Sequence, residues 1–176
     1  MKELKDMSLQ ELGGYVCSAL MKHKIHVVLS GGSCVEIYSR GDYTTCDLDF
    51  INQYNEKKQS IREIMLDLNF REYERYYIHD DIEHLVEFPA GPLGVGDTPV
   101  DEISEVKTDA GVLRMLTPTD CIKDRLAAFY HWGDEQCLQQ AVWVAQKNSF
   151  DIDSIEAWSI DERMGGKFIA FSQLLK

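Results

Sequence analysis

Hydrophobic residues near the amino terminus recur with the period of a helix. They stand at three- and four-residue spacing, at Leu9, Leu12, Val16 and Leu20. Ser8 and Glu11 match a capping box, in which each side chain satisfies a backbone N–H group of the other, so we expect the helix to begin there. It extends to Lys22, and Gly13-Gly14 is expected to weaken it locally because glycine lowers helix propensity.

Short apolar runs further along the chain predict strands. The clearest are His26 to Leu29, Asp47 to Ile51, Leu85 to Phe88 and Val112 to Leu116. The second of these runs alternates polar and apolar residues, which is typical of a strand with one buried face. A further segment, Phe70 to Ile78, is rich in aromatic and charged residues and resembles one or two exposed strands.

Helical spacing returns in three later parts of the chain. We expect a short helix over Cys34 to Arg40 and a longer one over Lys57 to Leu68. Thr117 is a candidate helix cap with Pro118 in the first turn, and the pattern from there to Lys176 is almost wholly helical. Breaks in it are expected near His131 to Gly133, Asn148 to Ser149 and Gly165 to Gly166.

These elements together predict the α+β (α/β) class, with a small mixed sheet flanked by helices. Residues 1–116 would form the core that contains the sheet, and residues 117–176 a helical region packed on it as one compact unit. Pro89 to Asp101 contains three prolines and three glycines, so we expect a loop there. That loop is the best candidate in the chain for a boundary or a lid.

Composition and charge narrow the possible functions. The chain has 176 residues, of which 44% are hydrophobic and 27% charged, as in a globular protein with a buried core. Lys and Arg number 18 and Asp and Glu number 30, so 18 − 30 gives a net charge of −12. This charge disfavours non-specific binding to duplex nucleic acid or to an anionic membrane surface, because both need many cationic side chains.

The cysteines and the amino-terminal residues point to the cytoplasm. The 5 cysteines are odd in number and form no CxxC motif, so we expect no disulfide framework. Charged residues stand where a signal peptide needs an apolar run, and no window approaches the roughly 20 apolar residues of a membrane span. We therefore expect a soluble cytoplasmic protein without a membrane partner.

Two aspartates supply the first candidate chemistry. Asp47 and Asp49 lie two residues apart on a predicted strand, so both side chains point to the same face. Paired carboxylates repel each other unless a cation lies between them. A pair of oxygen ligands suits Mg²⁺ or Mn²⁺, so the pattern predicts a divalent metal site.

A glycine-rich bend precedes these aspartates. Gly31, Gly32 and Ser33 lead from a predicted strand towards a predicted helix. Glycines allow backbone N–H groups to approach a phosphate closely, the start of a helix favours negative charge, and Ser33 adds a hydroxyl donor. A phosphate cradle beside a metal-binding acidic pair predicts phosphoryl or nucleotidyl transfer.

The segment from Leu29 to Phe50 resembles the signature of the DNA-polymerase-β-like nucleotidyltransferase superfamily. That signature has an apolar strand, a Gly-Gly or Gly-Ser pair, a short helix and loop, and then an Asp-apolar-Asp-apolar run. Downstream, Leu116 to Leu126 resembles a helix of small bacterial nucleotidyltransferase-like proteins, among them relatives of abortive-infection and toxin–antitoxin nucleotidyltransferases.

The resemblance implies a nucleotidyltransferase fold and a corresponding enzyme. It would move a nucleoside monophosphate from a nucleoside triphosphate to a hydroxyl group of a small molecule, a protein or an RNA end, with release of pyrophosphate. Asp47 and Asp49 would bind Mg²⁺ or Mn²⁺ as the cofactor. The phosphates of the triphosphate would bind at Gly31, Gly32 and Ser33.

The resemblance also implies a third carboxylate, which serves as a metal ligand or as a general base. Glu87 matches its place best, although a glutamate stands here where an aspartate is commoner, and Glu83 is the fallback. Lys123 and Arg125 on the later helix would contact phosphates or the acceptor.

Plainer interpretations stay open for several of these residues. Glu87 would face solvent on an edge strand, and Lys123 to Arg125 would form ion pairs on a solvated helix face. His79 to His84 contains potential zinc ligands but matches no zinc-binding spacing, so a polar turn explains it. The alternative function is a non-catalytic or regulatory module, for example one component of a toxin–antitoxin pair, acting as a homo-oligomer or with a partner protein.

Overall fold

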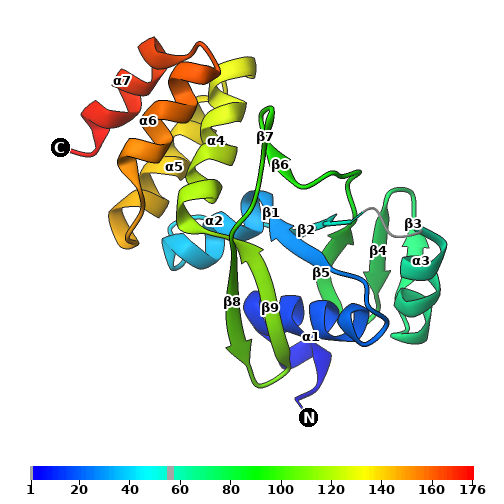
Figure 1. Ribbon diagram of the computed structural model, residues 1–176. Helices are drawn as coiled ribbons and strands as arrows, with labels where there is room; N and C mark the ends of the chain where they lie inside the picture. Colours follow the sequence, from blue (N-terminus) through cyan, green and yellow to red (C-terminus); the bar gives the residue numbers. More distant parts are fainter. Residues whose placement is uncertain (1, 55–57) are drawn as a thin grey trace.

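The computed structural model describes residues 2–54 and 58–176 (Figure 1). Its centre is a seven-stranded mixed sheet with the order β3-β4-β5-β2-β1-β9-β8. The strands are β1 (Val27–Ser30), β2 (Asp47–Asn52), β3 (Arg71–Tyr73), β4 (Tyr76–His79), β5 (Ile82–Glu87), β8 (Ile103–Thr108) and β9 (Gly111–Leu116). Two neighbouring pairs are parallel, β2 with β5 and β1 with β9, and the other pairs are antiparallel.

Helices flank this sheet within the described residues. They are α1 (Leu9–Lys22), α2 (Gly31–Ser39), α3 (Lys58–Asp67), α4 (Pro118–Trp132), α5 (Glu135–Lys147), α6 (Ile152–Asp161) and α7 (Gly165–Leu174), besides a short 3-10 turn at Leu4–Asp6. The last four gather into a bundle beside one end of the sheet (Figure 1). The predicted α+β class with a small mixed sheet and a helical carboxyl-terminal region is confirmed. In the part of the chain that the structure describes, no helix is both long and apolar enough to cross a membrane.

The first helix shows why two glycines stand in its middle. The predicted capping box is present, with the Ser8 N–H group donating to Glu11 at 2.7 Å and the Glu11 N–H group donating to Ser8 Oγ at 3.3 Å. A methyl group on Gly13 would come within 2.9 Å of Leu113, and one on Gly14 within 2.8 Å of Thr108 Oγ1. The glycines therefore lower helix propensity but allow α1 to pack closely on β8 and β9.

The predicted element boundaries shift at two places. Helix α2 begins at Gly31 rather than at Cys34, because β1 runs directly into it and the glycine bend is its first turn. Strand β8 has no counterpart in the apolar pattern, because its side chains are half-buried or exposed and it is held by pairing with β9. The expected start of the next helix at Lys57 lies outside the described residues, and α3 begins at Lys58.

The carboxyl-terminal helices begin and end mostly where the pattern predicts. Thr117 caps α4, with its hydroxyl oxygen accepting the Asp120 N–H group at 3.1 Å. At the other end, Gly133 follows the last residue of α4 and has a left-handed backbone conformation. The break at Asn148 is present as the end of α5. Gly165 and Gly166, expected as a break, are instead the first turn of α7, and the break lies just before them.

The proline- and glycine-rich segment is more ordered than a plain loop. It forms a small hairpin of β6 (Gly94–Val95) and β7 (Thr98–Pro99). The Asp97 N–H group at its tip donates to Glu162, just beyond α6, at 3.1 Å. The hairpin belongs to residues 1–116 but packs against the helical region, so it links the two predicted parts of the chain.

Candidate active site

Asp47 and Asp49 share one face of β2. Burial alternates along this strand: Leu48 and Phe50 are fully buried, whereas the two aspartates are half-buried. Leu48 lies on the side of the sheet that α1 covers, since a methyl group on Gly13 would be 3.7 Å from it. The two carboxylates therefore lie together on the opposite face, which is the arrangement that their spacing predicts.

A third carboxylate stands beside them. Glu87 on β5 is the register partner of Asp49 on the neighbouring parallel strand, and Leu85 is the partner of Asp47. Register partners on adjacent strands point to the same face of a sheet. Glu87 therefore lies on the face of the aspartates, and Glu83 lies one further pair down the strand from Leu85, away from Asp49.

The glycine bend lies directly against this cluster. Ser30, the last residue of β1, is the register partner of Asp49, so the chain enters α2 next to the Asp49 side chain. Gly31 has φ +64, and a methyl group there would come within 2.6 Å of Asp49 Oδ2. Glycine is required here both by the backbone conformation and by the close approach of the carboxylate.

The first turn of α2 keeps its backbone donors available. The N–H groups at the start of a helix have no partner within it, and the Ser30 side chain does not cap them. The Ser30 hydroxyl instead donates to the Asp49 carbonyl at 3.2 Å. The Ser33 hydroxyl donates to the Asp47 carbonyl and is fully buried, so it holds α2 to β2 and is turned away from a ligand in this conformation.

Negative charge accumulates at Asp49. Burial, with Glu87 and Asp47 as like charges, raises the pKa of its carboxyl group to about 6, and Arg125 opposes the rise. A divalent cation would relieve this repulsion, and the oxygen-only donor set fits Mg²⁺ or Mn²⁺. Among residues 2–54 and 58–176, however, no three acidic, histidine or cysteine side chains converge closely enough to hold a metal ion together.

Glu87 is held by a cation that the sequence analysis did not consider. Arg75, in the turn between β3 and β4, places its Nε 3.3 Å from Glu87 Oε2. Tyr76, the next residue, is the register partner of Glu87, and this pairing brings the turn to the site. Arg75 reaches the site because β4 pairs with β5. Residue spacing does not determine that pairing, so the sequence alone did not locate Arg75.

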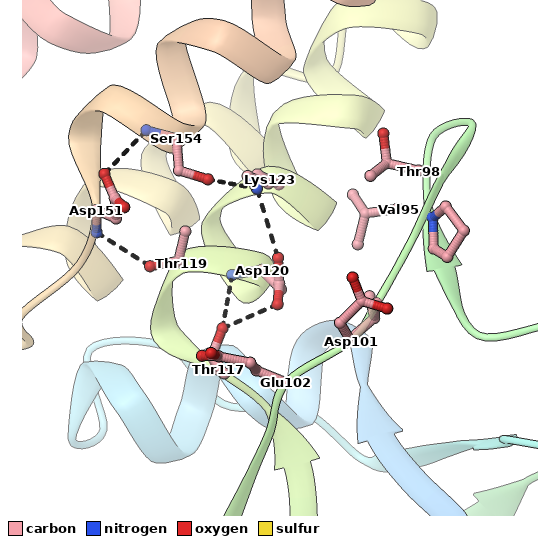
Figure 2. A pocket seen from close by; sticks show the side chains of 12 residues that line it. Val95, Thr98, Asp101, Glu102, Thr117, Thr119, Asp120, Lys123, Asp151 and Ser154 are labelled. Atoms are coloured by element: carbon pink, nitrogen blue, oxygen red, sulfur yellow. Dashed lines mark hydrogen bonds and ion pairs between the residues drawn. The ribbon is translucent and has the colours of Figure 1, made fainter.

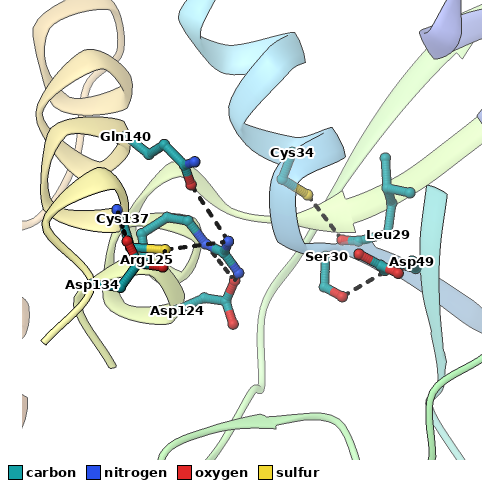
Figure 3. Close-up of polar contacts among 9 residues, drawn as sticks. All are labelled: Leu29, Ser30, Cys34, Asp49, Asp124, Arg125, Asp134, Cys137 and Gln140. Atoms are coloured by element: carbon teal, nitrogen blue, oxygen red, sulfur yellow. Dashed lines mark hydrogen bonds and ion pairs between the residues drawn. The ribbon is translucent and has the colours of Figure 1, made fainter. Parts of the chain in front are cut away.

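The two predicted cations on α4 lie in different places. Figure 3 shows Arg125 paired with Asp124 on the side of α4 that faces Ser30 and Asp49, with Gln140 of α5 3.5 Å from the guanidinium. The Arg125 charge opposes the rise in the pKa of the Asp49 carboxyl group. The ion pair of Arg125 with Asp124 is one that the plainer interpretation predicted, but its side chains are mostly buried, with exposed fractions of 17% and 25%, and do not lie on a solvated face.

Lys123 lies elsewhere because residues two apart on a helix point in nearly opposite directions. Its ammonium group donates to Ser154 at 2.9 Å and lies 3.7 Å from Asp120 (Figure 2). It lines a hollow of about 410 Å³ between the β6–β7 hairpin, α4 and α6. The structure therefore does not bring Lys123 together with the three carboxylates.

The segment from His79 to His84 contains the predicted polar turn at Asp80 and Asp81, while His79 ends β4 and Ile82 to His84 begin β5. His79 accepts the Asp81 N–H group at 3.1 Å, and its ring packs against Phe70 with centroids 5.1 Å apart. These contacts account for the buried His79 side chain as part of the fold.

Comparison with known proteins supports the fold. The sequence matches no protein-family model and no curated protein. The solution structure of the antibiotic-resistance factor ANT(2'')-Ia matches at a TM-score of 0.53 and 13% identity, over 94% of this chain and 95% of that one. A crystal structure of ANT(2'')-Ia in complex with adenylyl-2''-tobramycin matches at a TM-score of 0.42 and 12% identity, over 78% of this chain and 96% of that one.

The first likeness shows that the chain has the α+β fold of a nucleotidyltransferase, and at this identity it shows the fold alone. Neither likeness indicates a toxin–antitoxin component.

Proposed function

We propose that the protein is a metal-dependent nucleotidyltransferase that moves a nucleoside monophosphate from a nucleoside triphosphate to a hydroxyl group of a small molecule. The observation that carries this proposal is the position of the carboxylates of Asp47, Asp49 and Glu87. They share one face of the sheet, directly beside the uncapped start of α2.

The start of α2 would bind the phosphates of the triphosphate. Its first-turn N–H groups, from Gly31 to Ser33, are donors with no side-chain cap, and a helix start favours negative charge. Ser33 would contribute through its backbone, since its hydroxyl is bonded to Asp47. Arg125, on the facing side of α4, would add a positive charge towards the phosphates.

Asp47 and Asp49 would hold Mg²⁺ or Mn²⁺, with Glu87 as a further ligand or as a base. Such ions, when bound, neutralise phosphate charge and polarise the phosphorus–oxygen bonds. Glu87 would serve as a metal ligand or as a base only after leaving Arg75, because the Arg75 guanidinium pairs with the Glu87 carboxylate in this conformation.

Glu87 is the group best placed to accept the proton of the acceptor. In this step the acceptor oxygen would form a bond to the α-phosphorus, and the bond from that phosphorus to the bridging oxygen would break. Pyrophosphate would leave with the electron pair, and the hydroxyl proton would pass to the Glu87 carboxylate.

A small-molecule acceptor is favoured over the alternatives. The net charge of −12 disfavours a long RNA, which would need neutralising cations. The fold shared with an antibiotic-resistance factor supports a small molecule. The cytoplasmic location and a homo-oligomeric state stay predictions.

A second candidate function is a module that keeps this fold without catalysis and acts on a partner protein. The Arg75–Glu87 ion pair favours it, because it engages the third carboxylate internally. A relation to toxin–antitoxin components belongs to this candidate and stays a prediction.

The test is a transfer assay with each of the common nucleoside triphosphates, radiolabelled at the α-phosphate, together with Mg²⁺ or Mn²⁺ and a small-molecule extract. The enzyme predicts a labelled product and pyrophosphate, both lost in the double variant Asp47→Asn, Asp49→Asn. Asp109→Asn is the matched control, because Asp109 lies in the turn between β8 and β9, outside the cluster. If the wild type forms no product and binds no triphosphate in the presence of metal, the module is favoured instead.

A further inference from the structure

Arg75 is placed beside the carboxylate cluster by a tight turn and by a ring contact. Tyr73 pairs with Tyr76, so the turn between β3 and β4 has two residues, and Arg75 is the second of them. Tyr76 is also the register partner of Glu87 and lies on the same face of the sheet. The Arg75 guanidinium carbon lies 4.8 Å from the centre of the Tyr76 ring, within the range of a cation–π contact. The ring therefore supports the guanidinium next to Glu87.

The ion pair draws the Glu87 carboxylate towards the side of β5 opposite Asp49. In the sheet, β5 lies between β4 and β2. Arg75 reaches Glu87 from the β4 side, with its Nε 3.3 Å from Glu87 Oε2, whereas Asp49 lies on the β2 side. In the part of the chain that the structure describes, no three potential ligands meet as a metal site. The third carboxylate is thus engaged with Arg75 in this conformation.

The Glu87 side chain is long enough to serve either partner. A glutamate has one more rotatable bond than an aspartate, so a change of rotamer can move its carboxylate between neighbouring strands without backbone movement. Arg75 has 68% of its side chain exposed, so it can turn into solvent when it is released. An ion pair this exposed is weak, and a divalent cation attracts the carboxylate with twice the charge.

We propose that Arg75 is a positioning residue that acts through Glu87. It holds the third carboxylate apart from the two aspartates of β2 until a divalent cation binds them, and then releases it. The inference rests on the proposed function and deepens it, because it states when the third carboxylate joins the site. The group that would bind metal or accept the acceptor proton is free only when the metal ion is present.

The experiment is a titration of the full chain with Mn²⁺ alone, in which electron paramagnetic resonance measures the free ion. Arg75→Ala should lower the dissociation constant about two- to fivefold, because the guanidinium no longer competes for Glu87. Arg71→Ala is the matched control. It removes the same charge from the same hairpin, but Arg71 pairs with Asp80 at 2.7 Å, so Mn²⁺ binding should not change. Equal tightening in both variants, or none in Arg75→Ala, would overturn the inference.

A second pair of variants separates the release of Glu87 from simple charge repulsion. In Glu87→Gln the side chain has no charge for a guanidinium and a metal ion to compete for, so adding Arg75→Ala should leave the dissociation constant of Mn²⁺ unchanged. Repulsion between Arg75 and the ion does not need Glu87. Equal tightening by Arg75→Ala in both backgrounds would therefore contradict the positioning role.

NMR observes the release directly. Mg²⁺ should shift the Arg75 Nε–H signal of the wild type, because the guanidinium loses its carboxylate partner, and should leave that signal in place in Glu87→Gln. A wild-type signal that does not respond to saturating Mg²⁺ would show that the ion pair persists and would rule out the exchange.

The positioning role and the proposed function can fail separately. Mn²⁺ binding that is lost in the double variant Asp47→Asn, Asp49→Asn but is equal in Arg75→Ala and the wild type would support the metal site and overturn the role of Arg75. Mn²⁺ affinity that responds to Arg75→Ala only when Glu87 is present, in a protein that transfers no nucleotide, would support the role and contradict the proposed function. Mn²⁺ binding that the double variant retains in full would contradict both.

Discussion

The two polar regions beside α4 differ in how fully their groups are satisfied. At the hollow that Lys123 lines, Asp151 caps α6 by accepting the Ser154 N–H group at 2.9 Å, and Lys123 donates to Ser154 (Figure 2). At the other region Asp47, Asp49 and Glu87 share one face of the sheet, and the pKa of Asp49 rises to about 6 through burial and these like charges.

This difference separates polar groups that hold the fold from polar groups that a ligand would complete. A carboxylate that caps a helix stabilises the protein as it stands. Carboxylates that raise one another's pKa, as Glu87 and Asp47 raise that of Asp49, cost stability, and such costs are typical of functional sites. The hollow that Lys123 lines is therefore the weaker candidate for catalysis.

The largest difference between the two regions should appear in nucleotidyl-transfer activity. Asp47→Asn or Asp49→Asn is expected to lower nucleotidyl transfer about a thousandfold or more, because several kcal/mol of transition-state stabilisation depend on the metal site. Asp151→Asn should stay within about twofold of the wild type. Steady-state kinetics of the three variants measures this, and a similar loss in all three would remove the distinction between the regions.

The next effect is on stability at the glycine bend. Gly31→Ala should destabilise the protein by about 2–4 kcal/mol, because alanine disfavours a positive φ and its methyl group would press on Asp49. Gly166→Ala is the control, since a methyl group there meets nothing within 4 Å. Urea unfolding of both variants gives the comparison. Equal stability of Gly31→Ala and the wild type would show that the bend is not packed against the carboxylate.

A smaller effect of opposite sign is expected at Asp49. Its folded pKa of about 6 lies above the ordinary value of 3.8, so ionisation opposes folding at neutral pH. Asp49→Asn should therefore stabilise the metal-free protein by about 1–3 kcal/mol at neutral pH. The gain should be complete above the folded pKa and disappear as the pH falls towards the ordinary value. Urea unfolding across this pH range measures it, and a gain that persists in acid would exclude the electrostatic cause.

The smallest effect concerns the satisfied region. Asp151→Ala removes the cap of α6 and should cost about 1 kcal/mol, with transfer activity unchanged. Asp151→Asn should retain most of the cap, because an amide oxygen also accepts the N–H group. Thermal unfolding of the two variants decides this, and a stability cost in neither would mean that the carboxylate does not hold this end of the bundle.

The parts of the fold that could be predicted are those determined by local patterns. The alternation from Asp47 to Ile51 placed both aspartates on one face, and Ser8 and Thr117 marked two helix starts that the structure has. Strand β8 was missed because an edge strand needs little apolar surface of its own.

The parts of the site that could not be predicted depend on strand register and helix direction. Arg75 reaches Glu87 only because β4 pairs with β5, and residue spacing does not determine that register. Lys123 and Arg125 were grouped as one cationic pair, although two-residue spacing on a helix separates their directions. The Ser33 hydroxyl was expected to face a phosphate, whereas α2 begins early enough to turn it towards Asp47.

The most direct test of the central claim is calorimetric titration of a non-hydrolysable nucleoside triphosphate in the presence of Mn²⁺. The account predicts binding to the wild type and to Asp151→Asn, and none to the double variant Asp47→Asn, Asp49→Asn, which should remain folded. Equal binding to the wild type and to the folded double variant would contradict it, because the triphosphate would then bind without the carboxylate pair.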